Sequence, residues 1–294
     1  MGHDHAIDVF KTRVSAMPFD TVELTEWVGA EIIGLDLRQA LDEDTVAQLR
    51  EAWLRHHVLL FRGQELGEAE QVRFAGYFGR AMETQQNVNK KRRPDADPRV
   101  MLVSNIRENG TLIGTLPDGE LHYHSDSAFM ERPLMATVLY SMILTSTGGH
   151  TRFVNMHGVL DSLPGDVRAA IEGRRALNVF DFFTQVKTAK LDRATAVHFA
   201  HPAIRTHPET GRAALYVNRL MTEEIDGIAE ADGDALLANL FEATERSPFV
   251  YEHIWRKGDL IIWDNRSVQH SRTDYPPDEP RLLRRVGIEG DIPR

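Results

Sequence analysis

The chain has 294 residues, of which 42% are hydrophobic and 27% charged, as is usual for a soluble globular protein with a sizeable core. Its formal net charge of −10 argues against a general nucleic-acid binder, which needs clustered Lys and Arg. There is no cysteine, so disulfides and thiolate metal sites are excluded, and any metal must bind His, Asp or Glu. The longest apolar stretch, "LMATVLYSMIL", is too short to span a bilayer, and the N-terminus does not resemble a secretory signal. We therefore expect a cytoplasmic protein without membrane or nucleic-acid partners.

The first hundred residues mix strands and helices. Residues 28–37 predict a strand, and "VLLF" at 58–61 predicts a short buried one. Between them, residues 42–57 show apolar side chains at helical spacing after an acidic start, which predicts a helix. Residues 67–80 predict a second helix that stops near Gly79.

Strands prevail in the rest of the chain. Apolar runs predict strands at 134–145, 258–265 and 282–290, and "TGGHTRFVNM" at 147–156 predicts a turn followed by a strand. Residues 201–218 predict a hairpin with "PETG" at its tip, and helices are expected at 163–173 and 231–246. There is no internal repeat or low-complexity linker. We expect a β-rich α+β fold forming one domain over residues 1–294, with 1–20 as a loosely ordered extension.

Two histidines and an aspartate alternate in "LHYHSDSAFMERP". In an extended strand His122, His124 and Asp126 would share one face. A His-x-Asp pair alone is a weak signal. Together with His270, which follows an apolar strand, His124 and Asp126 would complete the facial triad of two histidines and one carboxylate found in non-haem Fe(II) oxygenases. Only folding can unite these residues, because 270 − 124 = 146 positions separate the histidines.

Two arginines follow His270 in "HSRTDYPPDEPRLLRR". Arg281 and Arg285 are four residues apart, so on a strand they share a face and can project into one cavity. Their guanidinium forks suit a bidentate grip on a carboxylate or sulfonate. The alternative is a pair of surface arginines beside Asp278 and Glu279.

Several segments, taken in order, resemble the TauD/TfdA family of Fe(II)- and 2-oxoglutarate-dependent dioxygenases. The resemblance rests on these segments: "GAEIIGLDL", "HHVLLFRGQELGEAEQVRFAGYFG", "HSDSAF", "GGHTRFVNM", "HPETGRAALYVN", and "WDNRSVQH" through "DYPPDEPRLLRRVGIEGD". It covers residues 22–294. It implies a double-stranded β-helix, or jelly roll, with flanking helices, and self-association into a dimer or tetramer.

The resemblance also implies roles for individual residues. His124, Asp126 and His270 would bind Fe(II), while Thr151 and Arg281 would hold the distal carboxylate of 2-oxoglutarate. The keto-acid end of this cosubstrate would chelate the iron, leaving a position for O2. Arg285 matches a residue that contacts the acid group of the substrate in taurine-using members. The implied reaction converts 2-oxoglutarate to succinate and CO2 and hydroxylates an unactivated C–H bond.

Some positions depart from the family pattern or concern the substrate. His150 in "GGHT" and Tyr123 replace residue types common in the family. The segment "PDGELHYH" lacks the polar residues that taurine-specific members place just before the motif, so taurine is a doubtful substrate. Tyr216 and Phe129 are candidates for a part-apolar substrate pocket, with core packing as the alternative. His122 is expected to line the pocket and not to bind the metal. Loops at 80–120 and 180–200 would set selectivity, with "RRPDADPRV" and "DFFTQVKTAKLDRAT" as lids that order on binding.

The leading interpretation is thus a dioxygenase that hydroxylates a small organic acid, such as a sulfonate or an aryloxyalkanoate, and thereby cleaves a carbon–heteroatom bond. The alternative is the same oxygenase chemistry, as hydroxylation or desaturation, on an amino acid or a natural-product intermediate. A zinc hydrolase would use the same ligand types but gives no reason for Thr151 and Arg281. A non-catalytic jelly-roll binding module would be expected to have a broken triad, and here the triad is whole.

Overall fold

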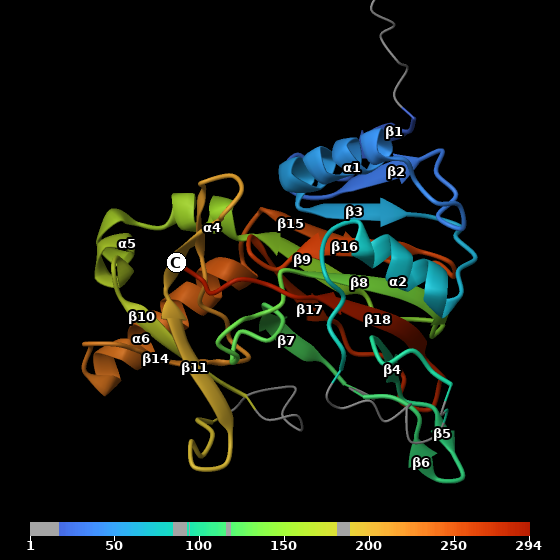
Figure 1. Cartoon of the computed structure of the whole chain (residues 1–294). Coiled ribbons are helices and arrows are strands. Elements are labelled where there is room, and N and C mark those ends of the chain that lie inside the picture. The colour runs from blue at the N-terminus through green and yellow to red at the C-terminus, as the bar shows by residue number, and fades with distance from the viewer. Residues whose placement is uncertain (1–17, 85–92, 94, 116–118, 181–188) are drawn as a thin grey trace, which may run out of the picture.

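The computed structural model of the chain describes residues 18–84, 93, 95–115, 119–180 and 189–294. Strands dominate this part of the chain, and helices flank them (Figure 1). The larger sheet, in spatial order, contains β1 Asp20–Glu23, β2 Ala30–Ile33, β3 Val58–Phe61, β16 Leu260–Asp264, β8 Ala136–Ile143, β18 Leu282–Ile288 and β4 Val100–Ser104. The smaller one contains β15 Val250–His253, β9 Thr151–Asn155, β17 Val268–Arg272 and β7 Leu121–His124.

Strand β3 is apolar throughout and β16 is apolar from Leu260 to Trp263, because both faces of the larger sheet are covered there. Along β16, Leu260 and Ile262 join the core that packs against the helices. Ile261 and Trp263 point the other way, into the core shared with the smaller sheet. This alternation follows from the two-residue period of a strand, and it explains why the pattern of apolar residues there does not alternate with polar ones.

Two helices cover the outer face of the larger sheet, where the sequence predicted them. Helix α1 (Glu43–His56) begins at Asp42, whose side chain accepts a hydrogen bond from the Thr45 amide at 2.7 Å. Helix α2 (Glu68–Gly76) is shorter than predicted, because the chain tightens into a turn after Gly76. Their buried faces pack on β3, β8, β16 and β18.

The inner face of the larger sheet packs against the smaller sheet. Phe153 of β9 lies 5.4 Å from the ring of Trp263 on β16, measured between centroids. Val268 of β17 and Leu283 of β18 belong to the same core. The two sheets thus face each other, and residues between them are held from both sides.

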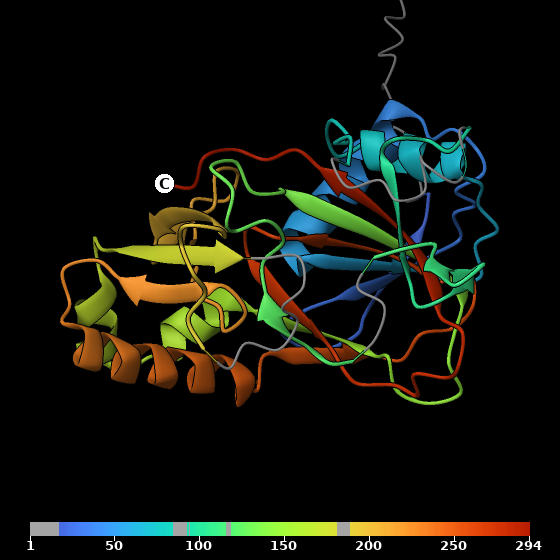
Figure 2. The same cartoon turned by 90° about the horizontal axis from the view of Figure 1, so that it is seen from below.

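A second group of elements lies beside the two sheets, at the left of Figures 1 and 2. It contains a three-stranded sheet with β11 Val197–Pro202, β10 Arg175–Phe180 and β14 Thr222–Ile225, and the helices α4 Met156–Ser162, α5 Gly165–Ile171 and α6 Glu230–Glu245. The predicted hairpin is present as β12 Ile204–Thr206 paired with β13 Ala213–Leu215, and a smaller one joins β5 Arg107–Glu108 to β6 Thr111–Leu112.

The expectation of a strand-rich fold with flanking helices is confirmed, but one helix was missed. The predicted strand at the end of "TGGHTRFVNM" stops at Asn155, and α4 begins at Met156. The side chain of Asn155 accepts hydrogen bonds from the amides of His157 and Gly158, and so starts the helix. In the described residues no helix is long and apolar enough to cross a membrane. Parts of both expected lids, residues 92, 94 and 181–188, lie outside the described residues.

Candidate active site

The pairing of β7 with β17 brings the distant histidines together. His270 and His124 are directly opposite in the register, and their ring centroids are 4.1 Å apart. Asp126 follows in the turn after β7, with Oδ1 3.8 Å from Nε2 of His124. One nitrogen or oxygen from each of the three side chains lies within 4.8 Å of the others, and all three residues are buried. The structure therefore assembles the His-Asp-His group that the sequence indicated.

His122 does not follow the simple alternation considered from the sequence. The register between β7 and β17 shifts at this point, because His124 pairs with His270 while Leu121 pairs with Arg272. A shift of this kind breaks the two-residue period of the strand. Among the described residues, His122 is outside the group that could hold a metal ion, and its ring lies near the charges of Glu120, Arg219 and Glu245.

The two histidines of the group are ready to bind a cation. Burial lowers the pKa of His124 and that of His270, so both rings are neutral at pH 7. Nδ1 of His124 donates to the backbone oxygen of His122 at 2.8 Å, which leaves a lone pair on Nε2, the nitrogen that faces Asp126. In the described part of the chain, Nδ1 of His270 is buried without a hydrogen-bond partner. A metal ion with nitrogen and oxygen ligands fits this set of donors.

Asp126 joins the smaller sheet to the larger one. Its Oδ2 accepts a hydrogen bond from Thr137 of β8 at 2.5 Å, and its Oδ1 lies 2.8 Å from Nη2 of Arg285 on β18. Burial alone would raise the pKa of Asp126, but the charge of Arg285, the two neighbouring histidines and the Thr137 hydrogen bond together outweigh this effect and hold the pKa well below its usual range. Asp126 is therefore an ionised, firmly oriented carboxylate.

Arg281 is a buried cation beside another cation. It is 2% exposed, and its Nη2 donates to the backbone oxygen of Gly149 at 3.1 Å. The ring of Tyr275 lies 5.3 Å from the guanidinium carbons of both Arg281 and Arg272. Burial and the charge of Arg272 lower the pKa of Arg281 to about 9, which leaves it charged at neutral pH. Within the described residues Arg281 makes no ion pair with a carboxylate, so its charge is uncompensated.

Thr151 lies on the same sheet as the two histidines. In the register of β9 and β17, Phe153 is opposite His270 and Thr151 is opposite Arg272, so Thr151 shares a sheet face with the triad histidine. Its hydroxyl oxygen accepts a hydrogen bond from the Trp255 indole at 3.0 Å. Thr151 is two residues from Gly149, which contacts Arg281, so the two predicted cosubstrate residues meet the same turn.

Phe129 and Tyr216 belong to one apolar cluster next to β7, together with Leu121, Phe180, Leu220 and Met221. Phe129 stacks on Phe180 with ring centroids 4.8 Å apart. The guanidinium of Arg205 lies 4.9 Å from the centroid of the Tyr216 ring. Both candidates are thus buried close to the segment that carries His124 and Asp126.

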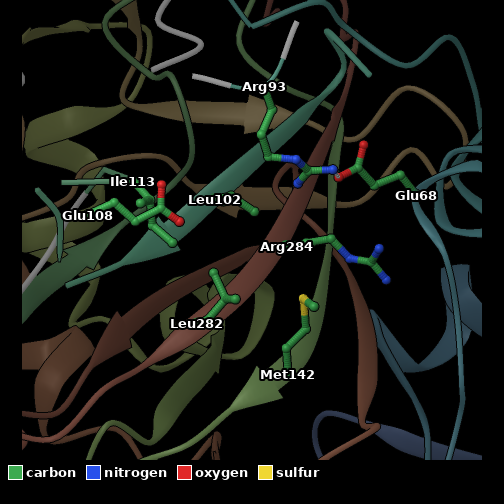
Figure 3. Close-up of a pocket in the computed structure, with 8 residues that line it drawn as sticks. All are labelled: Glu68, Arg93, Leu102, Glu108, Ile113, Met142, Leu282 and Arg284. Carbon is green, nitrogen blue, oxygen red and sulfur yellow. Dashed lines mark ion pairs between the residues drawn. The ribbon is translucent and has the colours of Figure 1, made fainter. Parts of the chain in front are cut away.

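The pocket drawn in Figure 3 lies apart from the group of His124, Asp126 and His270. It is lined by residues of α2, β4, β8 and β18, including Glu68 and Arg284. Arg284 and Arg285 are consecutive on β18, so their side chains leave opposite faces of the sheet. Arg285 points to Asp126, and the pocket beside Arg284 is therefore separated from the triad by the sheet.

Sequence reasoning missed three residues around the site: Thr137, Asn265 and Arg272. Thr137 stands in an apolar run and Asn265 in a turn, and neither carries a pattern of its own. The position of Arg272, two residues after His270 on a strand, was a usable signal because such residues share a face.

Comparison with known proteins identifies the family. The sequence matches the family described as "Taurine catabolism dioxygenase TauD, TfdA family" over residues 20–286. The chain belongs to this family. It is therefore a 2-oxoglutarate-dependent non-haem iron dioxygenase, whose reaction uses Fe(II), 2-oxoglutarate and O2. Membership favours an oxygenase over the zinc hydrolase and over the binding module.

Two relatives and one solved structure are similar over almost the whole length. The (S)-phenoxypropionate/alpha-ketoglutarate-dioxygenase of Sphingobium herbicidovorans is 29% identical, covering 93% of this chain and 96% of the relative. The alpha-ketoglutarate-dependent sulfate ester dioxygenase of Pseudomonas putida is 31% identical, covering 96% and 93%. The crystal structure of a taurine dioxygenase from Burkholderia xenovorans superposes with a TM-score of 0.77 at 28% identity, covering 94% and 91%.

Proposed function

We propose that His124, Asp126 and His270 hold Fe(II) in this TauD/TfdA-family dioxygenase. The observation that carries the proposal is the buried group of two neutral imidazoles and one ionised carboxylate, drawn together from two strands and a turn. When bound, Fe(II) with 2-oxoglutarate supplies the activation of O2 needed to hydroxylate an unactivated C–H bond, with release of succinate and CO2. The surrounding chain is proposed to be a jelly roll forming a single domain over residues 1–294.

Arg281 and Thr151 are proposed to bind the distal carboxylate of 2-oxoglutarate. A buried arginine without an acidic partner is costly unless a ligand supplies the negative charge. The second cation, Arg272, adds to the attraction for a dianion. The hydroxyl of Thr151 accepts from Trp255, so its own proton is free to be donated to a carboxylate oxygen.

Arg285 is proposed to orient an acid group above the metal ligands. Its Nη2 already contacts Oδ1 of Asp126 at 2.8 Å, and the side chain is 15% exposed, so it borders the same space as the triad. A guanidinium binds a carboxylate or a sulfate through two parallel hydrogen bonds, which positions the rest of the molecule.

The substrate is proposed to be a small organic acid with an apolar part, such as an aryloxyalkanoate or a sulfate ester. The named substrates of the two relatives support this class, and so does the apolar cluster containing Phe129 and Tyr216 next to β7. His122 is proposed to line the approach to this region. Hydroxylation beside the ether or ester oxygen gives an unstable product that breaks the carbon–oxygen bond. The enzyme is proposed to act in the cytoplasm as a dimer or tetramer.

The test is a screen for succinate release by the Fe(II)-loaded protein with 2-oxoglutarate. We expect release to rise with aryloxyalkanoates or sulfate esters above the level without substrate, with formation of the matching phenol or aldehyde. Release with aryloxyalkanoates and sulfate esters no higher than without substrate, or a larger rise with taurine or an amino acid, would contradict the proposed substrate class.

A further inference from the structure

We propose that Thr137 and Asn265 are positioning residues that fix the orientation of the Asp126 carboxylate through a one-way chain of hydrogen bonds. This inference rests on the proposed function of the triad and extends it to residues that touch neither the metal nor the substrate. Both residues are fully buried or nearly so, with exposures of 0% for Thr137 and 1% for Asn265.

The chain of hydrogen bonds has only one possible direction. The indole N–H of Trp263 is only a donor, and it lies 2.9 Å from Oδ1 of Asn265, which fixes that atom as the amide oxygen. The amide nitrogen of Asn265 therefore donates to Oγ1 of Thr137 at 3.1 Å. Thr137 has one hydroxyl proton, and it donates this proton to Oδ2 of Asp126 at 2.5 Å.

This direction assigns separate tasks to the two carboxylate oxygens of Asp126. Oδ2 accepts from the hydroxyl of Thr137, while Oδ1 lies 2.8 Å from Nη2 of Arg285 and is the oxygen that faces Nε2 of His124, at 3.8 Å. Oδ1 is therefore the oxygen directed to a metal ion. The amide of Asp126 also donates to Asn265, at 3.3 Å, so the same side chain holds both the backbone and the carboxylate of the ligand.

Asn265 itself is held rigidly by its neighbours in the turn between β16 and β17. Its backbone amide donates to Met135, and its backbone oxygen accepts from the hydroxyl of Ser125 at 2.6 Å. The preceding Asp264 is buried between Arg266 and His207, with contacts of 2.8 and 2.9 Å. A fixed partner is what an orienting hydrogen bond requires, because a mobile one would leave the carboxylate free to rotate.

The test compares three variants by their affinity for Mn(II), followed by electron paramagnetic resonance without turnover. Thr137→Val keeps the shape and removes the hydroxyl, and we expect a Kd for Mn(II) roughly 10- to 100-fold above wild type. Thr137→Ser keeps the hydroxyl and should stay within about threefold of wild type, since the orienting bond remains. Asn265→Asp can accept but not donate, so it diverts the Thr137 proton from Asp126 and should weaken Mn(II) binding as well.

A matched control lies outside the site. Thr222 is a buried threonine whose hydroxyl donates to Asn178 at 2.8 Å, and Thr222→Val should leave the Kd for Mn(II) unchanged. Urea unfolding of each metal-free variant separates loss of affinity from loss of fold. Affinity within twofold of wild type in Thr137→Val, or equal weakening in Thr137→Ser, would overturn the inference.

If Thr137→Val does not fold, Asn265→Asp decides by the same criterion, because unchanged Mn(II) affinity there would also reject the orienting role. Failure of the proposed function gives a different pattern. In that case the wild type would bind no Mn(II), or the His124→Ala variant would bind Mn(II) as tightly as the wild type does.

Discussion

Replacing Arg281 should weaken 2-oxoglutarate binding without lowering the stability of the protein. Most buried arginines stabilise a fold by pairing with an acid, but Arg281 has no such partner among the described residues. Arg281→Met removes a charge-assisted hydrogen bond to Gly149, worth about 1.5–3 kcal/mol, and relieves a desolvation cost of several kcal/mol for a buried ion. The free energy of unfolding of the metal-free protein should therefore stay constant or rise.

Arg266 provides the matched control. It is as buried as Arg281, at 3% exposure, but it donates to both carboxylate oxygens of Asp264 and contacts Glu209 at 2.7 Å. Arg266→Met leaves the fully buried Asp264 without its main counterion. Breaking a buried pair in this manner costs roughly 3–5 kcal/mol, so this variant should lose that much stability in urea unfolding.

The affinity for 2-oxoglutarate should respond to Arg281 instead. Loss of one partner of a buried charge pair costs about 2–5 kcal/mol, which corresponds to a roughly 30- to 4,000-fold higher Kd. Calorimetric titration of the Mn(II)-loaded protein under anaerobic conditions measures this directly. The reasoning would be refuted if Arg281→Met destabilised the protein as strongly as Arg266→Met while binding 2-oxoglutarate with wild-type affinity.

Three further predictions follow from the same structure. His124→Ala should abolish saturable Mn(II) binding and His122→Ala should retain it, and equal loss in both would contradict the ligand assignment. Burial lowers the pKa of His57 to about 3 and that of His201 to about 4, so the unfolded chain takes up their protons first as the pH falls below about 6.5. The contribution of these two neutral rings to the free energy of unfolding is complete above about pH 6.5 and decreases as the pH falls toward their folded pKa values. At pH 5 each ring should have lost about 2 kcal/mol of this contribution, and urea unfolding curves that coincide at pH 7 and pH 5 would argue against it. Gly149→Ala places a methyl group 3.0 Å from Nε of Arg281 at a φ of +64°, so this variant should bind 2-oxoglutarate more weakly. Gly165→Ala adds a methyl group with no atom within 4 Å and should not change the affinity; equal affinities in the two variants would exclude a role for the close approach at Gly149.

The parts of the site that lie within short motifs were predictable from the sequence. His124 and Asp126 stand two residues apart, and His270 follows a strand that its apolar residues mark clearly. The spacing of Arg281 and Arg285 predicted a shared strand face, but only the family resemblance implied that they lie at the site, and in the structure Arg281 immediately precedes β18. Each motif could be found from a local pattern, whereas the meeting of His270 with His124 depends on the pairing of β7 with β17.

The supporting residues were not predictable because their partners are distant in sequence. Thr137 meets Asn265 only through the pairing of β8 with β16, and Gly149 meets Arg281 only through the turn before β9. The register shift that interrupts the two-residue period of β7 near His122 depends on the pairing with β17. Long-range pairing decides each of these contacts, and no local pattern encodes them.

The most direct test of the proposed site is an anaerobic absorbance titration of the metal-free protein with Fe(II) and 2-oxoglutarate, on wild type and on Arg281→Met. The account predicts a weak visible charge-transfer band that requires both additions in the wild type and needs far more 2-oxoglutarate in the variant. A wild type that gives no band and binds Zn(II) tightly, or a band that is unchanged in Arg281→Met, would contradict it.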